Sequence, residues 1–465
     1  MMNRLLILGL LGSLTAWCAQ AQDLSALLRE RLAAVVAVEF SIEQELDRNV
    51  NVAFGVVVDN EGTIILEGNA ISARATPSQL VDWRVYRPNA PTISYSTAEY
   101  LGQDTFTGWH FVRVAEDGRE GLRPITDFAH EQSTRTPALA ESVWGIGLRM
   151  KEENFRPYFL ASRVSMTQAM PQLTGIALGD VAGRGLPVFD EQGAFLGLGA
   201  SGFGQSFVIY SSRRRGGDPS LLVNPDECAA FRLAADVLPY LNRIPENPYG
   251  RPIPWFGVDG IDPVDPEVAE FLGLGGNVGL VVSEVLAGSP AEQGGLLPRD
   301  IIVALDEVPL PRLKPDQVVV GHLQREISRR APGTDVLLTV LRDKVELSLP
   351  VTLADAPKTP AEADRRYYED LGMTIREMVY ADAVSRRSDA LNLTGVVAHF
   401  VNPSSAVSTA GLRYDDWIQS IDGRAVENYA DAISILDEVA DSGRQEFVLQ
   451  VSRGGQTSIL RVNLN

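Results

Sequence analysis

Short apolar runs, separated by Gly, Pro, Asn and Asp, make up the chain from Val35 to about Ser211. Such runs, bounded by turn residues, are typical of the strands of an all-β barrel or sandwich. A helical spacing of apolar residues predicts one helix before this region, over 24–34, and another after it, over 226–241. The clearest strands are predicted at 54–58, 63–66, 81–86, 109–114, 143–148 and 195–198.

The rest of the chain contains one pattern twice. Each copy has an apolar pair around a Gly, a strand, a turn containing Ser, Pro and Ala, a Gly-Leu pair and a helix. The first copy has Gly257 and a helix over 316–327, and the second has Gly372 and a helix over 429–439. Because the elements recur in the same order, the pattern predicts two domains of one α+β type.

Pro-rich and polar segments separate these regions and read as linkers. The first follows the barrel region, and the second lies between the two copies. We therefore divide the chain into a signal peptide at 1–21, a barrel domain at 22–243, a linker at 244–254, a first repeat domain at 255–353, a linker at 354–366 and a second repeat domain at 367–465.

The N-terminus has the pattern of a secretory signal. Arg4 is the basic residue, Leu5 to Leu14 is the apolar stretch, and Ala19-Gln20-Ala21 is a small-x-small cleavage site. The stretch is too short for a membrane-spanning helix, and no later run is apolar enough to span. The sequence therefore predicts a protein that is secreted across the inner membrane and works in the periplasm.

Acidic residues outnumber basic ones, 60 against 41, which gives a formal net charge of -19. The predicted signal carries one Arg and no acid, so the mature chain has a charge of -20. This surplus disfavours nucleic acid and anionic lipid as partners. Cys18 leaves with the signal, and Cys228 lies in an apolar pattern typical of a core residue. Without a Cys/His cluster of the zinc type, we predict no metal site and no cofactor.

The two copies resemble PDZ domains of the bacterial HtrA/DegP family. The first copy reads SPAEQGGLLPRDIIVALDEVPL, and the second reads PSSAVSTAGLRYDDWIQSIDGRAV. A PDZ domain binds an extended peptide at a sheet edge, while backbone N–H groups of a Gly-containing loop hold the terminal carboxylate. The resemblance therefore implies two peptide-binding modules.

The region before the copies resembles the trypsin-like domain of the same family. FGVVVDNEGTIILEGNAI is similar to the segment that leads to the catalytic His, and YLGQDTFTGWHFVRV to the one that carries the catalytic Asp. LGDVAGRGLPVFDEQGAFLGLGA is similar to the loop of the nucleophile. The implied fold is mostly β: a trypsin-like double six-stranded β-barrel, followed by two PDZ domains.

The sequence departs from the family at the positions of the three catalytic residues. Alignment of the three motifs places Asn69 at the His, Gly108 at the Asp and Arg184 at the Ser. A serine protease needs a hydroxyl, an imidazole that takes its proton and a carboxylate that orients the imidazole. An amide, a hydrogen and a guanidinium supply none of these. The sequence therefore predicts no catalytic residue and a pseudoprotease.

Other interpretations of this region stay open. His110 could replace the missing imidazole, although its place on a predicted strand favours a barrel residue. Ser201 lies in an Ala-Ser-Gly sequence, but beyond the expected nucleophile loop. Arg184 could hold a carboxylate beside backbone N–H groups, or it could be a surface cation without a role.

The resemblance also implies where peptides bind. The carboxylate loops come first, and a helix with an apolar stripe forms the other wall, or else faces the core. The candidate peptide-binding residues are Trp255, Phe256, Gly257, Val258, Val319 and Leu323 in the first copy and Asp370, Leu371, Gly372 and Met373 in the second.

Together these observations predict a non-catalytic HtrA-like envelope protein. It would bind exposed peptides or protein C-termini and act as a holdase or adaptor in protein quality control. The family resemblance implies a homotrimer. The alternatives are an active serine endopeptidase with unrecognised residues and a regulatory scaffold of an active protease.

Overall fold

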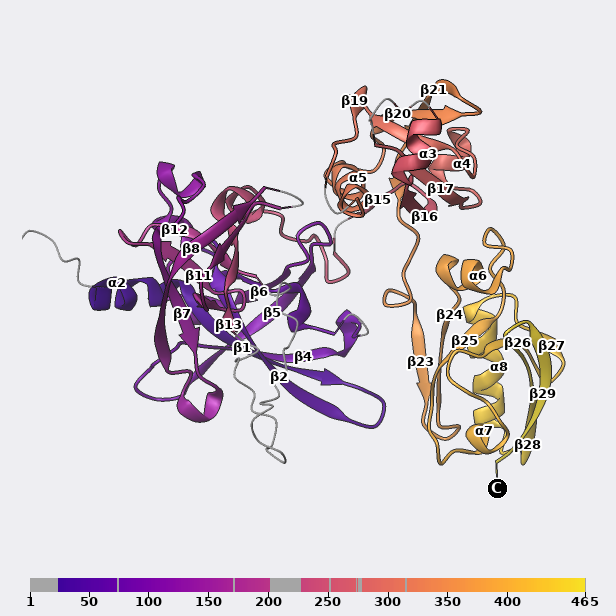
Figure 1. Cartoon of the computed structure of the whole chain (residues 1–465). Helices are drawn as coiled ribbons and strands as arrows, with labels where there is room; N and C mark the ends of the chain where they lie inside the picture. Colours follow the sequence, from indigo (N-terminus) through magenta and orange to yellow (C-terminus); the bar gives the residue numbers. More distant parts are fainter. Residues whose placement is uncertain are drawn as a thin grey trace, which may run out of the picture.

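The computed structural model describes residues 24–464, apart from 73–74, 170–171, 201–226, 251, 273, 275–277 and 314–315. The predicted signal peptide and Ser201 lie outside the described residues. The chain runs from the barrels, drawn in indigo to magenta in Figure 1, to two α+β units drawn in orange and yellow. In the described part, no helix is long and apolar enough to cross a membrane.

The first six strands close into a barrel with the order β1-β2-β3-β6-β5-β4. It is preceded by α2 (Leu24–Arg31) and the 3-10 helix η1 (Leu32–Ala34). The strands are β1 (Val35–Glu43), β2 (Arg48–Val57), β3 (Thr63–Leu66), β4 (Leu80–Tyr86), β5 (Tyr95–Gln103) and β6 (His110–Val114). The 3-10 helices η2 (Gly68–Ala70) and η3 (Pro77–Gln79) lie between β3 and β4, and η4 (Glu116–Gly118), η5 (Ile125–Phe128) and η6 (Glu131–Thr134) lead from β6 to the second barrel.

A second six-stranded barrel follows, with the order β11-β12-β14-β9-β8-β7. Its strands are β7 (Ser142–Leu148), β8 (Pro157–Gln168), β9 (Thr174–Ala177), β11 (Pro187–Asp190), β12 (Phe195–Gly199) and β14 (Ala230–Leu233). The short strands β10 (Ala182–Gly183) and β13 (Glu227–Cys228) pair with each other, and η7 (Lys151–Glu153) lies between β7 and β8. The mostly β fold with two six-stranded barrels is therefore confirmed.

The helix predicted over 226–241 is wrong. This segment begins with β13 and β14 and continues as the 3-10 helices η8 (Ala234–Asp236) and η9 (Leu238–Tyr240). Its apolar residues have helical spacing, but β14 completes the ring between β12 and β9. Phe231 and Leu233 are buried there, so barrel closure overrides the helix propensity of this sequence.

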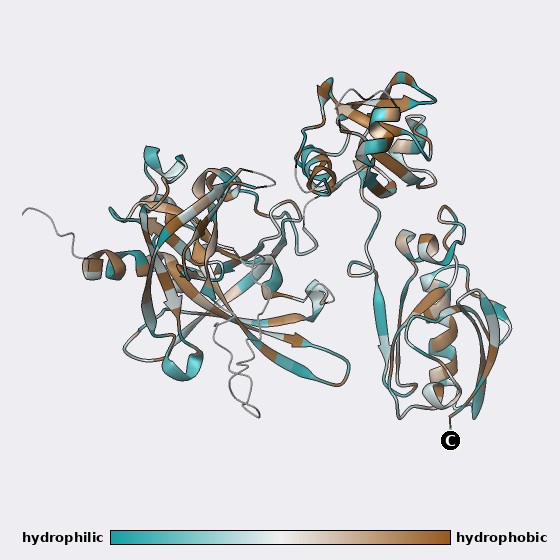
Figure 2. Ribbon diagram, viewed as in Figure 1, coloured by the Kyte–Doolittle hydropathy of each residue, from teal (hydrophilic) through white to brown (hydrophobic). Residues whose placement is uncertain are grey.

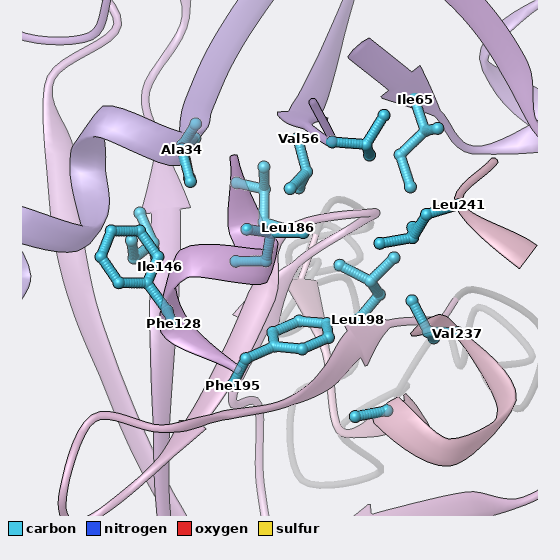
Figure 3. Close-up of a cluster of buried hydrophobic side chains, with 14 of the residues drawn as sticks. Ala34, Val56, Ile65, Phe128, Ile146, Leu186, Phe195, Leu198, Val237 and Leu241 are labelled. Carbon is cyan, nitrogen blue, oxygen red and sulfur yellow. The ribbon is translucent and has the colours of Figure 1, made fainter. Parts of the chain in front are cut away.

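Side chains from both barrels meet in one buried cluster (Figure 3). Val56 and Ile65 come from the first barrel, and Phe195 and Leu198 come from the second. Leu241, just after η9, packs into the same cluster. Because the barrels share this core, the loops at their junction are held in fixed positions relative to each other.

The first α+β unit has the sheet order β16-β17-β18-β20-β21. Its elements are β16 (Val258–Pro263), α3 (Pro266–Phe271), β17 (Leu280–Val285), α4 (Pro290–Gln293), β18 (Ile301–Leu305), β19 (Val308–Pro309), α5 (Val318–Ser328), β20 (Asp335–Arg342) and β21 (Val345–Thr352). The segment before β16 forms β15 (Pro254–Trp255), which pairs with β22 (Ala354–Asp355) after the sheet.

The second unit repeats these elements in the same order, with the sheet β23-β24-β25-β26-β28-β29. They are β23 (Arg365–Tyr368), β24 (Met373–Glu377), α6 (Tyr380–Arg386), β25 (Val396–Val401), α7 (Ala406–Thr409), β26 (Trp417–Ile421), β27 (Arg424–Ala425), α8 (Tyr429–Asp441), β28 (Glu446–Arg453) and β29 (Gln456–Asn463). In Figure 2, α8 is largely hydrophobic, whereas β23 is hydrophilic. The two units differ at one place, because β23 has no counterpart beside β16.

Candidate functional site

The three loops that carry Asn69, Gly108 and Arg184 meet at the junction of the barrels. A Cβ atom on Gly68 would clash with the carbonyl oxygen of Gly108, so the η2 segment touches the loop between β5 and β6. A Cβ atom on Gly185 would lie 3.2 Å from Cγ of Glu67, so the turn after β10 reaches the same segment. The chain thus brings the three aligned positions into one neighbourhood.

The residues at the three aligned positions are an amide, a glycine and a guanidinium, and they differ in exposure and conformation. Asn69 is exposed in η2, whereas Arg184 is half-buried in the turn before β11. Gly108 adopts a left-handed conformation with a φ of 78°. A side chain at this position would meet no atom within 4 Å but would strain the backbone. The loop is therefore shaped for a glycine.

A buried carboxylate does lie in the loop before β6, but it is already engaged. Asp104 is fully buried and accepts hydrogen bonds of 3.0–3.1 Å from Nε and Nη2 of Arg243. Oγ1 of Thr107 donates to the same carboxylate at 2.8 Å. Asp104 therefore holds the loop to the segment after η9 and is not available to orient an imidazole.

His110 on β6 is hydrogen-bonded to the η2 segment at the junction. The hydroxyl of Tyr100 donates to its Nδ1 at 2.9 Å, and its Nε2 donates to the carbonyl oxygen of Gly68 at 3.1 Å. Burial lowers the pKa of His110 to about 4, although the bond to the Gly68 carbonyl acts in the opposite direction. Both ring nitrogens are occupied, so His110 positions the η2 segment and offers no lone pair to a nucleophile.

Glu67 is the charged group at the centre of the junction. The pKa of its carboxyl group is raised overall, because burial outweighs the lowering by the positive charge of Arg232, the N–H of Gly68 and the positive charge of Arg184. Arg232, on β14, also lies over the ring of Trp109 at 5.5 Å. Arg184 thus acts electrostatically on a carboxyl group of the chain itself, whereas one interpretation of the sequence had it hold a carboxylate beside backbone N–H groups. Sequence reasoning missed Glu67 and Arg232, which lie far apart along the chain.

Cys228 is buried in β13, in agreement with its interpretation as a core residue. Among the residues that the structure describes, no group of three or more His, Cys, Asp or Glu side chains could hold a metal ion.

The first carboxylate loop, Trp255 to Val258, is fixed by its own carbonyl groups. The N–H of Ala291 donates to the Phe256 carbonyl at 3.0 Å, and the N–H of Leu286 donates to the Gly257 carbonyl at 3.0 Å. Gly257 has a φ of 86°, and a Cβ atom there would clash with Cβ of Ser289. The position therefore requires a glycine.

The groove that the resemblance implies beside this loop would have β16, where the sheet path ends, on one side. The helix α5 borders the other side, but its candidate residues Val319 and Leu323 are buried in the core of the unit. Val258, Ile261 and Val320 are only partly buried against the same core. They lie on β16 and α5. Because they are partly exposed, they could line a groove, which the fully buried Val319 and Leu323 could not.

The second loop, Asp370 to Met373, has the same construction. Gly372 has a φ of 67°, its carbonyl accepts from the N–H of Asn402 at 2.8 Å, and a Cβ atom there would press on Ser405. Leu371 and Met373 are buried, whereas Asp370 is exposed. One contact differs from the first loop: the N–H of Gly372 donates to the carbonyl oxygen of Tyr368 at 2.8 Å.

The groove helix of the first unit also contacts the barrel junction. The guanidinium of Arg325 lies 3.8 Å from the carboxylate of Asp236 in η8. It also lies over the ring of Phe106, two residues before Gly108. The helical pattern alone would leave Arg325 on a solvated face, so this contact could not be seen in the sequence.

Comparison with known proteins adds the following. Residues 257–353 match the PDZ domain family. The chain is 29% identical over 203 residues, 42% of its length and 38% of the relative's, to a "Probable periplasmic serine endoprotease DegP-like" of Rhizobium meliloti (strain 1021). It is 27% identical over 214 residues, 45% of its length and 39% of the relative's, to the protein of the same name in Brucella suis biovar 1. The chain thus spans about two-fifths of the length of these relatives.

A solved structure, "HtrA-type protease AlgW with decapeptide", resembles the fold with a TM-score of 0.51 at 17% identity. It covers 72% of this chain, which in turn covers 99% of that structure. The relatives are named DegP-like, residues 257–353 match a PDZ domain, and the solved structure shows a likeness of fold.

Proposed function

We propose that this HtrA/DegP-type chain binds exposed peptide segments or protein C-termini through its PDZ domains and does not cleave them. The observation that carries the proposal is the charge arrangement at the barrel junction. Arg184, at the position aligned with the nucleophile, acts on the internal carboxylate of Glu67. A permanent cation in that place supplies no hydroxyl for a serine alkoxide mechanism built on the family's positions, which supports the proposal.

The binding half of the proposal rests on the first PDZ unit. Gly257 has a left-handed φ of 86°, and β16 ends its sheet, which supports a peptide site beside this loop. A peptide added there gains main-chain hydrogen bonds, and its terminal carboxylate gains charge-assisted ones. The candidate ligands are peptides with a free C-terminus and an apolar last residue.

The location and role follow from the same reasoning. The relatives are named periplasmic, and the N-terminal pattern predicts export, so we place the protein in the periplasm. The acidic surplus keeps a client-loaded particle soluble. If three copies assemble, as the family resemblance implies, several weak grooves act together and raise avidity. Such a particle suits a holdase or an adaptor of quality control, or a regulatory partner of an active protease.

The printed names of the relatives favour a second candidate, an active serine endoprotease. The mature chain, incubated with casein and with a fluorophosphonate probe, distinguishes the two. We expect no hydrolysis and no stoichiometric label, whereas an active HtrA-type protease treated in parallel should show both. Stoichiometric labelling that disappears when one Ser is replaced would establish the enzyme and end the pseudoprotease proposal.

A further inference from the structure

The second PDZ-like unit differs from the first in the path of the segment before its carboxylate loop. In the first unit this segment is β15, which pairs with β22 and leaves the outer edge of β16 at the end of the sheet. In the second unit it is β23, which pairs antiparallel with β24 along its whole length, from Arg365 opposite Arg376 to Tyr368 opposite Met373. The edge that corresponds to β16 is thus covered by the chain's own strand.

The strand β23 lies between β24 and α8, where a peptide would lie in a PDZ groove. The hydroxyl of Tyr368 donates to the carbonyl oxygen of Ile433 in α8 at 3.4 Å. The guanidinium of Arg366 forms an ion pair of 2.9 Å with Asp437, one turn further along α8. Tyr368 is only 6% exposed and belongs to the core of the unit. One face of β23 therefore fills the groove.

The opposite face of β23 is fixed as well. Nη1 of Arg365 donates to Nε2 of His399 at 2.8 Å, and the ring of Tyr367 packs edge-on against Phe400. These two partners lie on β25. The strand is thus held by backbone pairing to β24 and by side chains on both of its faces.

The carboxylate loop itself is also engaged by this strand. The N–H of Gly372, one of the loop amides that would face a terminal carboxylate, donates to the carbonyl oxygen of Tyr368 at 2.8 Å. A peptide would have to replace both this hydrogen bond and the β23–β24 ladder. Because β23 is part of the same chain, its effective concentration at the groove is high, and a peptide in solution competes poorly.

We infer that Arg365–Tyr368 close the groove of the second unit in cis, so that it takes a peptide only after β23 leaves the edge of β24. The inference rests on the proposed function in one respect, since it treats both units as peptide modules. It assigns constitutive binding to the first unit and a gated, autoinhibited site to the second.

The test uses the full mature chain and a photoreactive peptide with a free carboxylate and a C-terminal Val. The double variant Arg366→Pro/Tyr367→Pro removes two backbone N–H groups and breaks the β23 ladder. The first unit has the same sheet without such a strand, so β24 to β29 should stay folded. Arg366→Ala, which keeps the backbone, is the matched control. Amide hydrogen exchange reports the opening of β23, and mass spectrometry maps the cross-linked residues.

We expect the wild-type chain and Arg366→Ala to cross-link within 257–353 alone. The double proline variant should also cross-link within 373–463, with a gain of at least about tenfold there, as for a groove closed more than about nine-tenths of the time. If exchange shows that β24 to β29 have unfolded, Arg366→Glu replaces the variant. It sets a like charge against Asp437 and keeps every N–H.

Equal cross-linking of both units in the wild-type chain would overturn the inference, as would an opened groove that takes no peptide. Capture by the opened second unit without any capture within 257–353 would instead count against the proposed function of the first unit and leave the inference standing.

Discussion

The guanidinium of Arg325 lies 4.8 Å from the centre of the Phe106 ring, which ties the groove helix of the first PDZ unit to the loop that carries Gly108. Arg243 lies at the same distance over that ring. Arg325 also approaches Asp236, so its charge is balanced within the barrel. The contact gives the helix α5 and the loop that carries Gly108 a shared boundary.

Arg325→Ala should therefore loosen the contact between the first unit and the barrel. A partly buried cation–π contact together with an ion pair is worth about 1–2 kcal/mol. We expect faster amide exchange around Phe106, without a change in the melting temperature of the first unit or of the barrels. Arg329→Ala, at the exposed C-terminal cap of the same helix, is the control. Identical exchange in the two variants would show that the contact does not hold the parts together.

The electrostatic influence of Arg232 and Arg184 on Glu67 leads to a stability prediction. At neutral pH, Arg184→Ala leaves the Glu67 carboxylate with less compensation and should destabilise the barrels by about 1–2 kcal/mol. Glu67→Gln removes the charge that needs compensation and should rescue part of this loss. Urea unfolding of both single variants and the double variant gives the coupling, expected to be about 1 kcal/mol. If the free-energy changes of the two single variants simply add in the double variant, Arg184 does not interact with Glu67.

The two loop glycines offer a matched pair for binding. Gly257→Ala introduces a clash with Ser289, and Gly372→Ala introduces one with Ser405, both at left-handed positions. With the second groove closed by β23, only Gly257→Ala should weaken binding of a peptide with a free C-terminus, by about tenfold or more. Calorimetric titration of both variants, with circular dichroism as a folding control, checks this. Equal losses in both would contradict the different roles of the loops.

The repeat was the most predictable part of the fold. Glycine is needed at 257 and 372 because the backbone turns left-handed there, and the helices over 318–328 and 429–441 have strong apolar spacing. These signals are local and survive in the sequence. The alignment of three motifs likewise placed Asn69, Gly108 and Arg184 on loops that meet in the structure.

What the sequence could not give depends on contacts between distant segments. The segment 226–241 has a helical pattern, yet β14 is made by barrel closure. The predicted linker at 354–366 ends inside β23. This strand pairs with β24, whereas the matching strand β15 of the first unit pairs with β22, and strand propensity does not distinguish these two arrangements. Glu67 and Arg232 are brought together only when the two barrels pack on each other.

His110 should make the stability of the barrels sensitive to acid. Its folded-state pKa of about 4 lies below the usual value of 6.5, so the unfolded chain binds more protons between these two pH values. The stabilisation by the neutral imidazole is complete above pH 6.5 and is lost as the pH falls toward 4. From the size of the shift, the loss is roughly 3 kcal/mol at most. His399 shifts in the same direction, and it is present in every protein compared.

His110→Gln removes this titration while keeping an N–H for the Gly68 carbonyl. The free energy of unfolding, measured in urea at pH 7 and at pH 4.5, should therefore fall more steeply for the wild-type chain than for the variant. His130→Gln serves as the control for loss of an imidazole elsewhere in the first part of the chain. Parallel pH profiles for wild type and His110→Gln would mean that His110 is solvated in its protonated form, and that it does not support the η2 segment as a buried neutral group.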